Sequence, residues 1–162
     1  MAVKQILTEP NEILRQISKP VESVSKEDQV LMDDMLETMY AANGIGLAAI
    51  QIGIAKRIIV MDLSRDNEKK EPRYFVNPVI QNKDSEKSTY EEGCLSVPNQ
   101  FAEIDRPSSC VVEYLDYDGK KQILNADGLL ATCIQHEMDH LEGILFIDYL
   151  SKLKKSMIIK KL

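Results

Sequence analysis

Residues 128–142 read GLLATCIQHEMDHLE, and this segment combines a helical apolar pattern with a metal-binding motif. Its apolar side chains recur at three- and four-residue steps, as on the buried face of a helix. These side chains belong to Leu129, Leu130, Cys133, Ile134, Met138 and Leu141. Gly143 follows as a candidate C-cap. The pattern predicts a helix from about Asp127 or Gly128 to Glu142 that is buried on most of its sides.

The predicted helix carries both histidines of the chain, His136 and His140. Residues four positions apart lie on one face of a helix, so both imidazoles can bind one metal ion. Glu137 lies between them, where a general base for hydrolysis is needed. The same motif also fits a core or surface helix that happens to contain two histidines. In outline, it indicates the site of a metal-dependent hydrolase.

A catalytic metal usually takes three protein ligands, so a third ligand has to come from elsewhere in the chain. Cys94 is the candidate. It belongs to EGCLS at residues 92–96, which we expect to form a loop between strands, and Gly93 permits a close approach of the backbone there. The competing thiol, Cys133, lies among apolar residues on the motif helix. We expect Cys133 and Cys110 to be buried structural thiols.

Upstream of the motif, the sequence predicts another long helix followed by several strands. Ser25 is the expected N-cap of this helix, and Asn43-Gly44 ends it. The following region is β-like, with runs at residues 57–63, 74–76, 79–81, 109–116 and 121–125. A basic amphipathic segment at residues 150–162 predicts a C-terminal helix. We therefore expect an α+β fold with mixed or antiparallel β-sheets wrapped around the central motif helix.

Length and composition limit the function classes. A chain of 162 residues fits one domain spanning residues 1–162. No apolar run approaches the ~20 residues that a membrane helix needs, and we find no secretory signal. The three cysteines lack CxxC spacing, which favours a reducing compartment and a cytoplasmic location. The net charge of -6 disfavours binding to DNA.

Three segments together resemble the signature motifs of peptide deformylases. They are GIGLAAIQ at residues 44–51, EGCLS at residues 92–96 and QHEMDH at residues 135–140, in the order typical of that family. Three motifs over nearly the whole chain are far more specific than HExxH alone. The resemblance implies a metal-dependent hydrolase that removes the formyl group from the N-terminal formylmethionine of nascent bacterial or organellar polypeptides and releases formate.

The resemblance also implies roles for individual residues. The metal ligands are expected to be Cys94, His136 and His140. Glu137 is expected to take a proton from water and return it to the leaving amine. The side-chain amide of Gln51 and the backbone N–H of Leu95 are expected to stabilise the oxyanion. The expected substrate-binding residues are Gly44, Ile45, Gly46, Glu92, Leu129 and Cys133.

Some of these residues also have purely structural interpretations. Without the resemblance, Gln51 fits a polar residue at a strand edge, and Ile45 and Leu129 fit core positions equally well. Arg106 is the nearest plausible partner for the carboxylate of Glu92, so we expect the two to pair.

Two further positions outside the ligand set bear on the site. We expect Asp139 to support the ligand helix without touching the metal. Phe101 occupies a position where some relatives carry arginine, which predicts altered peptide affinity and unaltered catalysis.

One thiolate and two imidazoles suit several divalent metals. The resemblance favours Fe²⁺ in the cell, with Zn²⁺, Ni²⁺ or Co²⁺ replacing oxygen-sensitive iron in purified protein. The implied partner is an N-formylmethionyl peptide, and the location is the bacterial cytoplasm or an organellar matrix. The basic C-terminal segment predicts either a weak contact with ribosomal RNA or a last helix that simply packs on the domain.

Two other functions fit part of the sequence. A general HExxH metallopeptidase would share the histidine motif, but the chain has no further histidine to complete a metzincin-type ligand set. A noncatalytic binding protein stabilised by a metal would need four protein ligands, and no convincing fourth ligand accompanies the other three. Deformylation therefore remains the favoured function.

Overall fold

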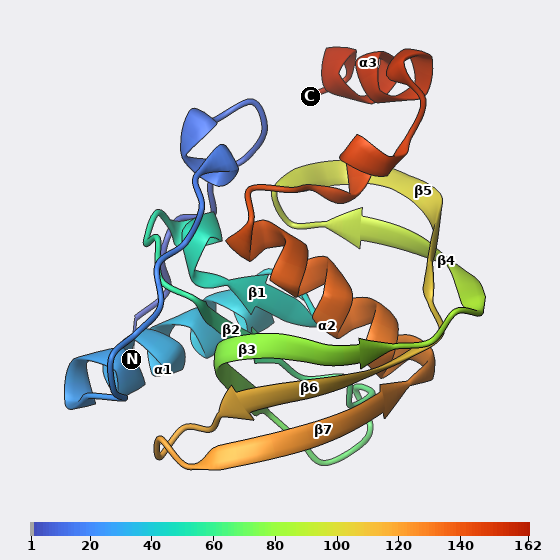
Figure 1. The fold of residues 1–162 in the computed structure, drawn as a ribbon. Coiled ribbons are helices and arrows are strands. Elements are labelled where there is room, and N and C mark those ends of the chain that lie inside the picture. The colour runs from blue at the N-terminus through green and yellow to red at the C-terminus, as the bar shows by residue number, and fades with distance from the viewer. Residues whose placement is uncertain (1) are drawn as a thin grey trace.

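The computed structural model describes residues 2–162, which form two antiparallel sheets and three α-helices (Figure 1). Five strands pair in the order β1-β2-β3-β6-β7. They are β1 (Gly46–Ala48), β2 (Ile58–Met61), β3 (Arg73–Lys83), β6 (Ser109–Leu115) and β7 (Lys121–Asp127). The other sheet is a hairpin of β4 (Lys87–Cys94) and β5 (Val97–Pro107).

Helix α1 (Lys26–Ala41) confirms the first predicted helix and its N-cap. Ser25 Oγ accepts a hydrogen bond from the N–H of Asp28 at 3.2 Å, and the Asp28 carboxylate accepts one from the N–H of Ser25 at 3.1 Å. This reciprocal capping satisfies two backbone donors at the start of the helix. Asn43, with a φ of 56°, turns the chain out of the helix. The GIGLAAIQ motif therefore starts at a fixed position.

Helix α2 (Gly128–Leu141) is the central helix that the sequence predicts. It ends shortly before Gly143, which adopts the left-handed conformation with a φ of 74°. It lies between the five-stranded sheet and the β4-β5 hairpin (Figure 1). Ile134 and Leu141 are fully buried in a core shared with the strands. The α+β fold with antiparallel sheets around the motif helix is confirmed.

The β4-β5 hairpin corrects the prediction of a loop at residues 92–96. Glu92, Gly93 and Cys94 are the last residues of β4, and only Leu95 and Ser96 form the turn to β5. Strand β4 is buried on one face only, and the side chains on its exposed face are mostly charged or polar. It therefore lacks the apolar content by which the other strands were predicted.

The runs at residues 74–76 and 79–81 join in β3, where the register with β6 shifts. Asn77 lies at this irregularity with a φ of 51°, so the interruption that separated the two predicted runs is a bulge within one strand.

After α2 the chain passes through a single 3-10 turn, η3 (Phe146–Tyr149), into helix α3 (Lys152–Lys160). An ion pair of 2.7 Å between Lys155 Nζ and Asp148 Oδ1 ties α3 to η3. No helix within residues 2–162 is long and apolar enough to cross a membrane. Helix α3 confirms the predicted C-terminal helix, but none of its residues is buried.

Candidate active site

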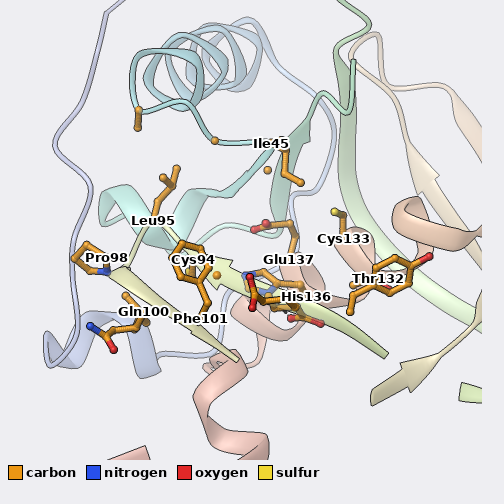
Figure 2. A pocket seen from close by; sticks show the side chains of 18 of the residues that line it. Ile45, Cys94, Leu95, Pro98, Gln100, Phe101, Thr132, Cys133, His136 and Glu137 are labelled. Atoms are coloured by element: carbon orange, nitrogen blue, oxygen red, sulfur yellow. Dashed lines mark hydrogen bonds and ion pairs between the residues drawn. The ribbon is translucent and has the colours of Figure 1, made fainter. Parts of the chain in front are cut away.

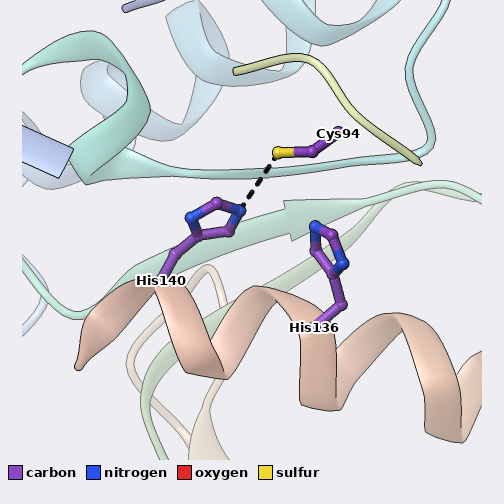
Figure 3. A group of neighbouring side chains, drawn as sticks. All are labelled: Cys94, His136 and His140. Carbon is purple, nitrogen blue, oxygen red and sulfur yellow. Dashed lines mark hydrogen bonds between the residues drawn. The ribbon is translucent and has the colours of Figure 1, made fainter. Parts of the chain in front are cut away.

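The three predicted metal ligands lie together between the hairpin and the central helix (Figure 3). Cys94 ends β4, while His136 and His140 project from adjacent turns of α2. Their ligand atoms all lie within 4.8 Å of one another, and Cys94 Sγ is 3.4 Å from His140 Nε2. Zinc bond lengths place the sulfur and nitrogen ligands of one tetrahedral ion about 3.5 Å apart. The donor set and its spacing therefore fit one divalent ion.

The ring of His136 is held from the side opposite Cys94. Its Nδ1 hydrogen-bonds Glu92 Oε1 at 2.9 Å, which leaves Nε2 free to face the thiol. Metal-binding histidines typically use such a carboxylate partner to fix the tautomer and the ring orientation. The side chain of Glu92 thus borders the pocket while its carboxylate fixes the ring of the predicted ligand His136.

The predicted pairing of Glu92 with Arg106 is confirmed as a buried bidentate ion pair. Arg106 Nε lies 2.7 Å from Glu92 Oε2, and Nη2 lies 3.0 Å from Oε1. The third nitrogen, Nη1, donates to Asp139 Oδ2 at 2.8 Å. Burial disfavours the charge on Arg106, but these two carboxylates outweigh it and raise the arginine pKa. Asp139 thus contacts the same arginine that pairs with Glu92.

Glu137 and His140 are both buried, with opposite consequences for charge. Burial raises the pKa of Glu137 to about 7, so its carboxylate can gain or lose a proton near neutral pH. Burial lowers the pKa of His140 well below its ordinary value, which favours the neutral imidazole that binds metals. Glu137 Oε1 has no hydrogen-bond partner among the described residues. It is therefore available to a water molecule or a substrate.

Gly46 provides the space that the Glu137 carboxylate occupies. A Cβ atom at position 46 would lie 2.5 Å from Glu137 Oε2 and 3.0 Å from Cδ. Any side chain there would displace the carboxylate from its place beside the ligands. The second glycine of the GIG motif is therefore matched to the glutamate of the HEMDH motif.

Gln51 lies in a 3-10 turn, η2 (Ala49–Ile52), and not at a strand edge. Its Oε1 accepts a hydrogen bond from the N–H of Ala48 at 3.0 Å, which fixes the amide orientation. Its Nε2 donates to Ser96 Oγ at 3.0 Å and lies 3.6 Å from Cys94 Sγ. The second N–H of the amide therefore points to the ligand cluster. Leu95, adjacent to Cys94, lies in the hairpin turn.

A pocket of about 550 Å³ opens at this cluster (Figure 2). All six expected substrate-binding residues line it, namely Gly44, Ile45, Gly46, Glu92, Leu129 and Cys133. Ile45 and Leu129 are 45% and 46% exposed, so both belong to the pocket wall and not to the buried core. Burial raises the pKa of Cys133 to about 12, which makes it an unreactive apolar part of the wall.

Several lining residues were not among the candidates predicted from the sequence. They include Tyr90, Pro98, Gln100 and Thr132. Helical spacing identifies Thr132, because it lies four residues before His136 on the same face of α2. Strand alternation identifies Tyr90, which shares a face of β4 with Glu92 and Cys94, once β4 is recognised as a strand.

The chain matches a known family over almost its entire length. The sequence model of the family described as Polypeptide deformylase matches residues 3–156. A peptide deformylase from Pelagibacter ubique is 80% identical over 162 residues, which is 100% of this chain and 94% of that protein. One from Phenylobacterium zucineum is 59% identical, covering 99% of this chain and 95% of the relative.

Solved structures agree with the sequence comparison. Peptide deformylase from Ehrlichia chaffeensis, in complex with actinonin, has a TM-score of 0.95 and 45% identity, covering 99% of this chain and 96% of that one. The enzyme from Legionella pneumophila has a TM-score of 0.93 and 44% identity, covering 99% of this chain and 93% of that one. The chain therefore belongs to the polypeptide deformylase family, metal-dependent enzymes that remove the N-formyl group from nascent polypeptides.

Proposed function

We propose that this pocket hydrolyses the formyl amide of peptides that begin with N-formylmethionine, with Cys94, His136 and His140 as ligands of one divalent metal ion. The observation that carries the proposal is the position of the ligand cluster. The ligand atoms lie within 4.8 Å of one another in a pocket that is also lined by Glu137 and Gln51. A metal, a base and an amide donor thus meet where a peptide can enter.

Glu137 is the proposed general base and acid. A divalent ion bound at the cluster would polarise the formyl carbonyl and lower the pKa of water. The unpartnered Oε1 of Glu137 then takes a proton from the attacking water and delivers it to the leaving amine. Burial supports this role, since a carboxylate whose pKa lies close to neutral both accepts and returns a proton readily.

Two donors from different elements would stabilise the negative charge that develops on the formyl oxygen. The amide of Gln51 is oriented before the substrate arrives, because Ala48 and Ser96 hold its two ends. The N–H of Leu95 follows directly after Cys94 in the hairpin turn. Donors fixed in advance favour the transition state, since they need no reorganisation during the reaction.

The apolar wall of the pocket suits a methionine side chain. Ile45, Leu129 and Cys133 supply this wall beside the ligand cluster. Strand β1 is the edge of the five-stranded sheet, β4 belongs to the separate hairpin, and the pocket lies between them. An extended peptide between these edges would place alternate side chains on opposite sides. Phe101, 63% exposed at the rim, would meet residues after methionine.

The metal in the cell is proposed to be Fe²⁺, with Zn²⁺, Ni²⁺ and Co²⁺ as functional substitutes in purified protein. One thiolate and two imidazoles accept each of these ions. Apo-protein reloaded anaerobically with each metal in turn, and assayed at equal occupancy, separates them. Higher turnover with Fe²⁺, and its loss on exposure to air, support iron. Equal turnover with Zn²⁺ in air contradicts it.

The test of the proposed chemistry is formate release from a short N-formylmethionyl peptide by anaerobically purified protein. The parallel sample is Glu137→Ala, with metal content measured in both. Turnover by the wild type and loss in the variant at equal metal content support the assigned base. Cleavage of an unformylated internal peptide bond would instead favour a general metallopeptidase, and a fully loaded but inactive wild type would favour a metal-stabilised binding protein.

We also propose a weak, salt-sensitive contact between α3 and ribosomal RNA, which places the protein where translation occurs, in a bacterial cytoplasm or an organellar matrix. The residues of α3 are all at least partly exposed, and Lys152, Lys154 and Lys160 carry positive charge on an otherwise acidic chain. Cosedimentation with ribosomes at low and high salt tests this. Equal binding after deletion of residues 152–162 would contradict the proposal.

A further inference from the structure

A continuous row of polar side chains connects Tyr149 to the ligand His136. The Tyr149 hydroxyl is 2.7 Å from Asp139 Oδ2, and the same oxygen accepts from Arg106 Nη1 at 2.8 Å. Arg106 then donates hydrogen bonds from Nε and Nη2 to the Glu92 carboxylate, and Glu92 Oε1 lies 2.9 Å from His136 Nδ1. Each step is a hydrogen bond of normal length, and every step has a carboxylate as one partner.

Tyr149 covers this row on the face of α2 turned away from the substrate pocket. Its ring centroid lies 5.0 Å from Arg106 Cζ, within reach of a cation–π contact. Tyr149 is 53% exposed, whereas Arg106 is only 4% exposed. A groove of about 770 Å³ on this face is lined by both residues and by Asp139. The tyrosine therefore separates the buried ion pairs from solvent.

The η3 turn that carries Tyr149 also contacts His136 directly. The ring of Phe146, at the start of η3, stacks on the imidazole with a centroid distance of 6.1 Å and an interplanar angle of 24°. Asp148 anchors the turn through Arg15 Nη1 at 2.5 Å and the N–H of Leu145 at 3.0 Å. The turn is thus fixed to the body of the protein and contacts the ligand at one end and its supporting row at the other.

We propose that Tyr149 is a positioning residue that sets the orientation of His136 toward the metal, acting through Asp139, Arg106 and Glu92. The inference rests on the ligand set given under Proposed function. The hydroxyl shares Asp139 with Arg106 and so fixes the plane of the guanidinium. That plane determines where the Glu92 carboxylate lies, and the carboxylate fixes the His136 ring.

The test measures metal binding as well as turnover. Co²⁺-loaded Tyr149→Phe, which removes only the hydroxyl, is compared with wild type in its absorption spectrum and in the rate of metal release to a chelator. Partners that contact a ligand directly change metal affinity about 10–100-fold. Because Tyr149 acts at a distance, we expect about three- to tenfold faster release and a shifted Co²⁺ spectrum.

A matched control separates positioning from general stability. Tyr114 packs its ring 4.6 Å from that of Phe75, away from the ligand cluster, so Tyr114→Phe removes a hydroxyl of the same kind. We expect wild-type release from this control. Arg106→Lys and its combination with Tyr149→Phe complete a double-mutant cycle. If both residues act through one row, their effects on the release rate do not multiply.

The outcomes distinguish failure of the inference from failure of the ligand assignment. One equivalent of Co²⁺ on wild type and its loss in Cys94→Ser, His136→Ala and His140→Ala establish the ligand set independently of Tyr149. With that established, unchanged release and an unchanged spectrum in Tyr149→Phe overturn the positioning role. Effects of Tyr149→Phe and Arg106→Lys that simply multiply overturn the proposed row as well.

Discussion

Helices α2 and α3 both have apolar residues at helical spacing, yet they lie in opposite environments. Nine residues of α2 are buried, including the charged or titratable His136, Glu137 and His140, while α3 buries none. Leu141 of α2 is fully buried, and Leu153 of α3 is 71% exposed. Apolar periodicity therefore locates a helix but does not determine how much of the helix the rest of the protein covers.

The covering of α2 comes from segments that are remote in the sequence. Strand β4 supplies Glu92 and Cys94, β5 supplies Arg106, and β1 supplies Gly46, whose missing side chain leaves room for Glu137. Helix α3 has one ion pair to the preceding turn and a partly buried Ile158. Substitutions on and around α2 should therefore affect activity and stability, while those on α3 should affect neither strongly.

The largest effect is expected at Glu137. Replacing it with glutamine in Glu137→Gln keeps the size but removes the base, and general acid–base catalysis contributes about 10²–10⁴-fold. We expect kcat for formate release to fall by at least about 100-fold at unchanged metal content. Glu142→Gln, on the exposed C-cap of the same helix, is the matched control and should keep wild-type kcat. Equal activity of the two variants would contradict the assignment.

The next largest effect is expected at Arg106. Arg106→Ala leaves the carboxylates of Glu92 and Asp139 without their shared partner, and breaking a buried pair in this way costs about 3–5 kcal/mol. Urea unfolding measures that loss, and metal titration should show about 10–100-fold weaker binding. Arg65→Ala, which removes an exposed pair at 3.8 Å, should change neither quantity. Unchanged metal affinity in Arg106→Ala would show that the pair does not support the ligand.

A pair of identical substitutions tests the two helices directly. Leu141→Ala on α2 creates a cavity in the core, and we expect a loss of about 2–5 kcal/mol in the free energy of unfolding. Leu153→Ala on α3 removes an exposed side chain, so we expect a change within about 0.5 kcal/mol. Chemical denaturation of both variants with the same metal content provides the measurement. Similar losses would mean that α3 packs more closely than the structure indicates.

The smallest effect is expected at Asp148, whose ion pair with Lys155 attaches α3 to η3 and whose carboxylate makes the free energy of unfolding depend on pH. Burial disfavours the charge on Asp148, but hydrogen bonds from Lys155 and Arg15 outweigh it and lower the aspartate pKa. The unfolded chain then binds more protons than the folded one at acidic pH, so this stabilisation is present above the unfolded pKa of about 3.9 and disappears as pH falls through the folded value.

Asp148→Asn should therefore lower stability at neutral pH and flatten its dependence on pH below about 5. Unfolding midpoints from pH 7 downward check this. Asp118→Asn, in the β6-β7 turn, is the control for loss of an aspartate charge. A slope in Asp148→Asn as steep as in wild type would show that the ion pairs to η3 make no contribution.

Much of the fold was predictable because the decisive signals are local. Ser25 and Asp28 form the capping box at the start of α1, and Gly143 follows the end of α2 in the left-handed conformation. The meeting of the three candidate ligands was predictable from the sequence, since His136 and His140 share a helix and Gly93 permits a close approach of the backbone beside Cys94. The structure brings these three together as expected.

The hairpin and the supporting row were less visible in the sequence. Strand β4 has one exposed, charged face, so Glu92 and Cys94 looked like loop residues. Tyr149 lies outside every motif, and its place over Arg106 depends on the tertiary path of η3. The contact between Tyr149 and Arg106 joins two elements that are remote in the sequence, and no local pattern indicates it.

The ligand cluster joins the two layers of the molecule, since Cys94 lies on the hairpin and His136 lies on the central helix. An ion held by both of these proposed ligands would act as a noncovalent crosslink. A ligand that binds only the folded state stabilises it by about 4.1 kcal/mol when its concentration is 1,000 times its dissociation constant. With the proposed ligands, the stability of the folded enzyme would depend on metal supply, and metal starvation would lower both its activity and its folded fraction.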